Sequence, residues 1–175
     1  MFDIINNSFK KGLLTEKFIL PQDESSRQID SAGEQLKKII HKLYGRSLHL
    51  REVDTGSCGA CESELIALSN PIYDIQRFGV DFVASPRHAD ALVVTGPVSR
   101  NMALALKKTF NSMPEPKFVI TVGDCALKGG IFRDSYYAIG DIQSITGSVV
   151  LHIPGCPPEP IIILHNLISF LKQKS

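Results

Sequence analysis

The sequence predicts an α/β domain built on a doubly wound parallel sheet, and three features of the chain carry that prediction. Continuous apolar runs, typical of strands buried on both faces, recur between residues 46 and 153. Stretches with apolar residues at helical spacing separate these runs, so strands and helices alternate along the chain. Glycine-rich turns follow several of the runs. A chain of 175 residues is long enough to bury one core without disulfide bonds.

The first 45 residues are predicted to form an N-terminal helical arm outside this domain. An amphipathic segment is indicated by apolar residues at helical spacing, namely Phe2, Ile5, Phe9 and Leu13. It either packs on its own domain or docks on a partner or a membrane face. The polar residues 21–30 predict a linker that leads into a helix over 31–44. We therefore divide the chain into an arm, 1–45, and an α/β domain, 46–175.

The elements of the α/β domain are predicted in turn. A strand over 47–53 leads through a glycine-rich turn into a helix over 60–69, which Pro71 ends. A helix over 99–112 begins after Ser99, a candidate N-cap. Further strands are expected over 82–83, 91–96, 117–123 and 148–153, with a closing helix over 161–171.

Composition excludes several classes of function. The formal net charge of +1 gives no electrostatic footprint for nucleic acid. No apolar run reaches the roughly 20 residues that a membrane-spanning helix needs. The N-terminus lacks a charged-then-apolar signal pattern, which makes a cytoplasmic location the expectation. In that reducing compartment, closely spaced cysteines favour metal or catalytic roles over disulfides.

Each of the four cysteines follows the carboxyl end of a predicted buried strand. Cys58 and Cys61 follow the first strand, Cys125 follows the strand that ends at Val122, and Cys156 follows the last. Parallel strands point the same way, so these turns emerge at one edge of the sheet, where open α/β sheets bind their ligands. The sequence therefore predicts that the four thiols meet at one site.

Spacing alone leaves the occupant of that site open. An iron–sulfur cluster and a structural zinc ion both accept four thiolates, although zinc sites usually pair two close Cys-x-x-Cys units. A redox-active pair at Cys58 and Cys61 would leave the other two cysteines without a role. Some of the four could also be small buried apolar residues.

Five motifs in order resemble a known family: Cys58-Gly59-Ala60-Cys61-Glu62, Ser85-Pro86-Arg87-His88-Ala89-Asp90, Thr95-Gly96-Pro97-Val98, Gly129-Gly130-Ile131-Phe132 and Pro154-Gly155-Cys156-Pro157-Pro158. Over residues 46–172 the chain resembles the small, cluster-bearing subunit of membrane-bound energy-converting group 4 [NiFe] hydrogenases. It is similar also to the homologous 20 kDa (B) subunit of respiratory complex I. The complex I branch has adjacent cysteines at the first ligand site, so the Cys58-x-x-Cys61 spacing resembles the hydrogenase branch.

The resemblance implies a flavodoxin-like fold with one [4Fe–4S] cluster, held by Cys58, Cys61, Cys125 and Cys156. It implies an electron-transfer subunit without a catalytic centre of its own. Its partners would be a NiFe-type large subunit, a ferredoxin-like iron–sulfur subunit and membrane subunits, on the cytoplasmic face of the membrane. The alternatives are a complex I-like subunit that passes electrons to quinone or another acceptor and, from another class, a zinc-stabilised structural adaptor.

Four further residues are candidates for supporting roles. Glu62 and Glu64 open the helix after Cys61, where carboxylates interact favourably with the helix N-terminus. Because carboxylates next to a reduced cluster are repelled by it, we expect one of them to relay protons. Arg87 and His88 are expected near the cluster, where a cation raises the reduction potential and a histidine couples electron and proton uptake. Their alternative is a structural Arg87–Asp90 ion pair beside an exposed histidine.

Overall fold

The computed structural model describes residues 24–174. Its centre is a parallel sheet of five strands in the order β2-β1-β3-β4-β5. The strands are β1 (Leu48–Asp54), β2 (Val80–Phe82), β3 (Ala91–Thr95), β4 (Phe118–Val122) and β5 (Leu151–Ile153). This is the flavodoxin-like strand order, and it confirms the predicted fold class. The last strand is shorter than predicted, because regular pairing with β4 begins only at Leu151.

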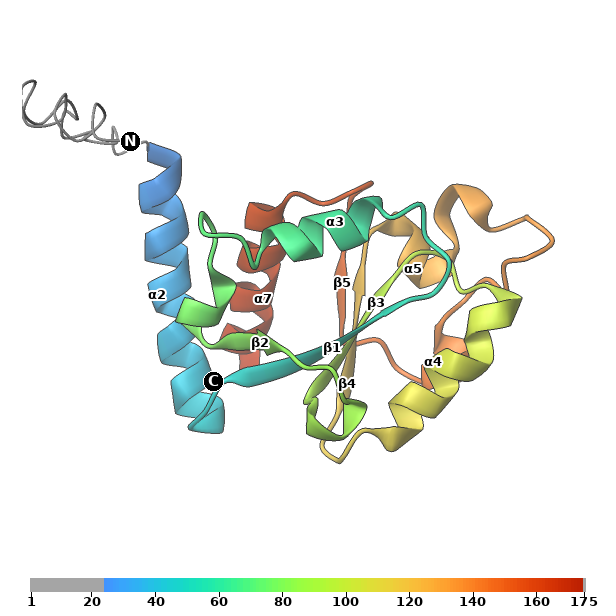
Figure 1. The fold of residues 1–175 in the computed structure, drawn as a ribbon, viewed down its shortest axis with the longest axis horizontal. Helices are drawn as coiled ribbons and strands as arrows, with labels where there is room; N and C mark the ends of the chain where they lie inside the picture. The colour runs from blue at the N-terminus through green and yellow to red at the C-terminus, as the bar shows by residue number, and fades with distance from the viewer. Residues whose placement is uncertain (1–23, 175) are drawn as a thin grey trace, which may run out of the picture.

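Helices cover both faces of the sheet (Figure 1). One face carries α2 (Glu24–Tyr44), α3 (Ala60–Ala67) and α7 (Pro160–Lys174), and the other carries α4 (Arg100–Ser112) and α6 (Gln143–Thr146). Short elements complete the described chain: α5 (Asp124–Lys128) and the 3-10 helices η1 (Ile75–Phe78), η2 (Pro86–His88) and η3 (Gly130–Phe132). The predicted cap of α4 is confirmed, since the Ser99 hydroxyl accepts a hydrogen bond from the Met102 N–H at 3.3 Å.

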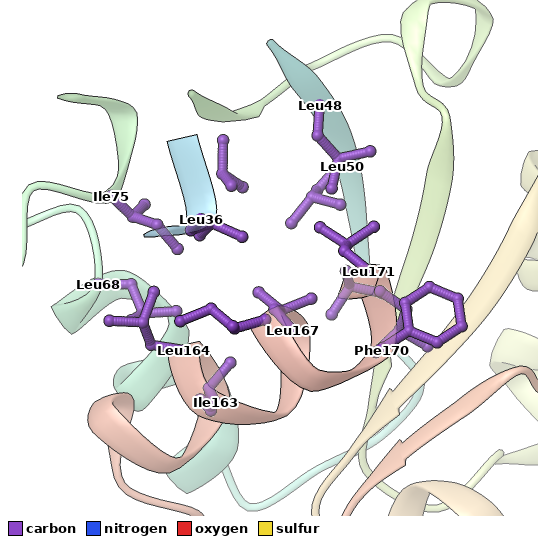
Figure 2. Packing of buried hydrophobic residues seen from close by; sticks show 14 of the residues in the cluster. Leu36, Leu48, Leu50, Leu68, Ile75, Ile163, Leu164, Leu167, Phe170 and Leu171 are labelled. Atoms are coloured by element: carbon purple, nitrogen blue, oxygen red, sulfur yellow. The ribbon is translucent and has the colours of Figure 1, made fainter. Parts of the chain in front are cut away.

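Each face of the sheet has its own apolar core. On the first face, Leu48 and Leu50 of β1 lie under Leu167 and Leu171 of α7 (Figure 2). On the second face, Leu92 and Val94 of β3 and Val119 of β4 pack with Leu106 of α4. The alternation of side chains along the strands sends neighbouring residues to opposite cores, which is why β3 and β4 are apolar almost throughout.

Helix α2 starts earlier than the sequence predicts. Residues 24–30 belong to the helix and not to a linker, because Ile29 extends the apolar stripe that Ala32, Leu36 and Ile40 continue at helical spacing. The stripe packs into the first core against α7 (Figure 2). The described part of the predicted arm thus shares its core with the sheet. The amphipathic segment predicted around Phe2 to Leu13 lies outside the described residues.

None of the helices between residues 24 and 174 has the length and the apolar character needed to cross a membrane.

Candidate metal centre

The first cysteine turn is held in shape by Asp54, the last residue of β1. One oxygen of its carboxylate accepts hydrogen bonds from the backbone N–H groups of Gly56 and Ser57, each at 2.8 Å. The other oxygen accepts from the Ser57 hydroxyl at 3.0 Å, and that hydroxyl accepts from the Gly59 N–H at 2.9 Å. Cys58 therefore sits in a turn whose N–H groups are satisfied by side chains of the turn itself.

Thr55 ties this turn to the one that follows β3. Its buried hydroxyl lies 2.8 Å from the Thr95 carbonyl oxygen and 3.0 Å from that of Gly96. The Ser99 N–H donates back to the Thr55 carbonyl at 2.9 Å. The position of the first two thiols is thereby fixed relative to the centre of the sheet.

The turns that carry Cys125 and Cys156 are joined to each other by Asp124. Its backbone N–H donates to the Gly155 carbonyl at 2.9 Å, and its carboxylate accepts from the Gly155 N–H at 2.9 Å. The Gly123 N–H donates to the Ile153 carbonyl at 2.8 Å. Asp124 therefore orients the neighbouring turn as well as its own.

All four thiols line one pocket at the carboxyl edge of the sheet, together with the side chains of Phe132 and Pro157. The turns that bring them there lie at the end of the sheet where α3 and α5 begin (Figure 1). Cys58 and Cys156 are exposed, whereas Cys61 and Cys125 are partly buried, and none of the four forms a disulfide.

Two glycines make room for the two deeper thiols. Gly123 has a φ of 86°, and a β-carbon at this position would collide with the Sγ atom of Cys61. A β-carbon on Gly130 would stand 2.8 Å from the Sγ atom of Cys125. The absence of side chains at these two glycines thus leaves space for the sulfur atoms of Cys61 and Cys125.

The four thiols do not converge on a single point. Among residues 24–174, no three histidine, cysteine or carboxylate side chains lie close enough to hold one metal ion. Thiolates on one zinc ion, with Zn–S distances of about 2.3 Å, would lie within roughly 4 Å of one another.

The two partly buried thiols have raised pKa values in the metal-free chain. The pKa of Cys61 is raised to about 11, first by burial and then by the neighbouring thiols Cys125, Cys156 and Cys58. Burial also raises the pKa of Cys125, while a hydrogen bond from the Ile131 backbone N–H lowers it. This N–H points at sulfur, an arrangement that stabilises negative charge on a thiolate or on a cluster.

A residue that the sequence reasoning missed is Glu52 of β1. Its pKa is raised to about 7, first by burial and then by the negative charges of Glu62 and Asp54. The alternation of the strand was the available signal: Leu48 and Leu50 face the core, so Glu52 faces the same side. Of the predicted pair, Glu62 lies in the first turn of α3, and both Glu62 and Glu64 are half-buried.

Arg87 and His88 are not brought to the thiols. They form η2 immediately before β3, at the amino end of that strand, and line a separate cavity of about 660 Å³ with Arg46, Asp90 and Pro114. The predicted alternative is also corrected, because Asp90 pairs with Arg46 at 2.6 Å and not with Arg87. The cause is chain direction: η2 enters its strand, whereas the cysteine turns leave theirs.

Comparison with known proteins places the chain in a known family. The family model described as NADH ubiquinone oxidoreductase, 20 Kd subunit, matches residues 58–170. A protein described as a probable membrane-bound hydrogenase subunit, from Pyrococcus furiosus, is 42% identical over 147 residues, 82% of this chain and 87% of that protein. Formate hydrogenlyase subunit 7 of Escherichia coli is 39% identical over 83% of this chain, which spans 58% of that relative.

A complex I subunit and two solved structures are also similar to this chain. The B subunit of NADH-quinone oxidoreductase from Clostridium beijerinckii is 43% identical over 69% of this chain and 70% of its own length. A chain of the membrane-bound sulfane sulfur reductase, an archaeal respiratory membrane complex, superposes with a TM-score of 0.65 at 29% identity, over 80% of this chain and 75% of that chain. An NAD⁺-reducing [NiFe]-hydrogenase shares the fold, with a TM-score of 0.55 at 18% identity over 73% of this chain and 93% of its own.

Proposed function

Because the chain belongs to the family of the 20 kDa subunit of NADH ubiquinone oxidoreductase, we propose that it carries one [4Fe–4S] cluster and transfers electrons. The cluster is held by Cys58, Cys61, Cys125 and Cys156. The observation that supports this most directly is the pocket lined by all four thiols, which come from turns far apart in the sequence. When bound, such a cluster takes up and gives up one electron.

The surroundings of the pocket suit that group. Gly123 and Gly130 leave space next to Cys61 and Cys125. The Ile131 N–H donates to the Cys125 sulfur, as backbone donors around clusters do. The protein positions the four thiols, which bind iron as thiolates, and excludes water from the partly buried side of the pocket. Cys58 and Cys156 are exposed, so electrons can enter or leave the cluster on their side.

The sequence supports a zinc-stabilised adaptor less well than a cluster-bearing subunit. Structural zinc sites usually pair two close Cys-x-x-Cys units, and this chain has one such unit, at Cys58 and Cys61. In a cluster each thiolate binds its own iron, so the sulfur atoms stand farther apart.

The complex we propose is a membrane-bound hydrogenase. The relatives include hydrogenase and quinone oxidoreductase subunits, and the spacing of Cys58 and Cys61 resembles the hydrogenase branch. Electrons would pass between a ferredoxin-like iron–sulfur subunit and the NiFe site of a large subunit. The subunit would lie on the cytoplasmic face of the membrane, attached through membrane subunits. A complex I-like role, with quinone or another acceptor, is the alternative.

An apolar surface next to the pocket supports docking of the large subunit there. Ile131 and Tyr136 are 84% and 89% exposed, and Ile139 is 43% exposed. All three lie in the segment after Cys125, and Phe132 of the same segment lines the pocket. Exposed aromatic and aliphatic side chains gathered in this way are typical of protein interfaces.

Anaerobic purification of the native complex tests the proposal. We expect this chain to add about four irons to those of the partner iron–sulfur and NiFe subunits, with a one-electron cluster signal in electron paramagnetic resonance that Cys125→Ser removes. Cys125→Ser should lose iron, and Ser144→Ala, at an exposed position of α6, should not. Zinc in place of iron would contradict the proposal. Hydrogen-dependent dye reduction by the same preparation separates the hydrogenase from the quinone reductase.

We also propose that Glu62 or Glu64 relays protons for the large subunit. Each is half-buried on α3, beside the thiol pocket. Normal hydrogen turnover in both Glu62→Gln and Glu64→Gln would contradict this role.

A further inference from the structure

The side chain of Glu52, on β1, has a carboxylate oxygen without a hydrogen-bond partner. Its Oε1 atom is buried and has no hydrogen-bond partner. Strand β2 ends at Phe82, level with Leu50, so at Glu52 strand β1 pairs only with Val93 of β3. The carboxyl group lies on the face of the sheet that carries α3.

A cavity connects this carboxyl group to water. The cavity has a volume of about 230 Å³ and is lined by Glu52, by Leu65, Ile66 and Ser69 of α3 and the turn after it, and by Phe82 of β2. Several water molecules fit such a volume, since each occupies roughly 30 Å³ in the liquid. Ile66 is 64% exposed, so the cavity reaches the surface at its position.

The charges around Glu52 favour its neutral form. Glu62 of α3 and Asp54 of β1 face it with negative charge, and Arg51 opposes them weakly. Arg51 is the next residue of the same strand, and its Nη1 lies 3.4 Å from the Val83 carbonyl oxygen. The groups that line the cavity from α3 and β2 carry no charge. An unpaired carboxylate in such a place loses its hydration without gaining an ion pair.

We propose that Glu52 is a proton-carrying group of this chain, which in each turnover accepts a proton from cavity water and passes it to the carboxylate of Glu62 on α3. The side chain alternates between the carboxylic acid and the carboxylate, one proton is taken up and one is passed on, and no electron passes through it. Its part in turnover rests on the proposed function, because protons are the substrate or the product there. Its proton binding rests only on the geometry of β1 and α3. Its pKa of about 7 places both forms within reach at neutral pH.

The test uses the intact complex with Glu52→Gln, which keeps the shape of the side chain and removes the titrating group. Asp81→Asn is the matched control. Asp81 lies on the neighbouring strand, in register with His49, so its side chain points to the opposite face. We expect Glu52→Gln to slow hydrogen evolution by about tenfold or more near neutral pH. Glu52→Asp, which retains a carboxyl group, should recover part of the rate, and Asp81→Asn should match the wild type.

Two further measurements separate a loss of proton transfer from a loss of the cluster. Iron content and the paramagnetic signal should be unchanged in Glu52→Gln. Infrared spectra of the wild-type complex should show a protonated carboxyl band that disappears as pH rises through about 7 and is absent from Glu52→Gln. The proposal is overturned by an unchanged rate and pH profile in Glu52→Gln, or by a loss of rate that accompanies loss of iron. If the wild-type complex contains no iron, the proposed function fails, and the infrared band still decides whether Glu52 binds a proton near neutral pH.

Discussion

The Sγ atom of Cys61 occupies the space that a β-carbon on Gly123 would need. Cys61 opens α3 and Gly123 follows β4, so two distant segments of the chain meet at this contact. The contact explains why the turn after β4 has no side chain at this position.

Replacing Gly123 with alanine should therefore abolish iron binding. Gly147→Ala is the control, because its φ of 81° is close to the 86° of Gly123 and a β-carbon there would meet nothing within 4 Å. Both variants should lose about 1–3 kcal/mol of folding free energy through backbone strain. Only Gly123→Ala should also displace Cys61, which iron analysis and thermal unfolding would reveal. Equal iron content in the two variants would contradict the expected displacement of Cys61.

Alkylation of the metal-free chain should distinguish the buried thiols from the exposed ones. The thiolate is the nucleophile, and burial raises the pKa of Cys61 to about 11, so little thiolate is present at Cys61 near pH 8. We expect Cys58 and Cys156, which are exposed, to react first with iodoacetamide. The rate at Cys61 should rise with pH until about 11. Mass spectrometry of digested samples measures each site, and equal rates at all four thiols would show that the pocket is open.

Iron binding should also weaken as pH falls. Cys61 and Cys125 both have raised pKa values through burial, and each thiol must lose its proton before it can bind iron. Competition with a chelator at several pH values measures this dependence. A binding constant that does not change with pH would contradict the protonated state of the free thiols.

Stability should fall as pH rises through the range in which Glu52 titrates. Its pKa is raised from 4.5 to about 7 by burial and then by Glu62 and Asp54. Between these values the unfolded chain has released the proton and the folded chain still holds it, so each rise in pH favours unfolding. The loss levels off above pH 7. Glu52→Gln should match the wild type near pH 4.5 and unfold less readily above pH 7, as denaturant titrations at both pH values would show.

Asp90 should contribute more to folding than an exposed acid does. Its carboxylate accepts from Arg46 at 2.9 and 2.6 Å and from the His49 backbone N–H at 2.9 Å, with only 14% of the side chain exposed. Asp90→Ala should lower the free energy of unfolding by roughly 2–3 kcal/mol. Asp30→Ala, which breaks an exposed pair with Arg77, should cost less than about 1 kcal/mol. Denaturant titration compares them, and similar values would show that burial of Asp90 is irrelevant.

Within residues 46–174, the elements that could be predicted are those marked by a pattern in neighbouring residues. The apolar runs at 91–96 and 117–123 indicate buried strands, because a parallel strand packed on both faces has no polar positions. Ser99 could be recognised as an N-cap from its own side chain and position. The thiols could be assigned to one edge of the sheet, because chain direction alone sends every turn after a parallel strand to that edge.

Other features depended on partners that are remote in sequence. Helix α2 begins at Glu24, and its buried stripe, which includes Ala32 and Leu36, packs in the core formed with α7, a contact across most of the chain. Arg87 and His88 lie away from the thiols because η2 precedes β3 and so lies at the amino end of that strand. The prediction that they lie near the thiols was wrong because the thiols follow the carboxyl ends of their strands. Asp124 joins the turns of Cys125 and Cys156 through Gly155, a residue that no local pattern connects to it.

The class of the fold, and the edge of the sheet at which the four thiols gather, could be predicted from the amino-acid sequence. Both follow from the apolar periodicity of neighbouring residues, which predicts parallel strands. Three features became visible only in the folded chain: the four thiols share one pocket, Gly123 makes room for Cys61, and Glu52 lines a cavity with its Oε1 atom unpartnered. The physical reason is that burial, desolvation and close contact arise between segments distant in the chain, and their strength depends on three-dimensional separation.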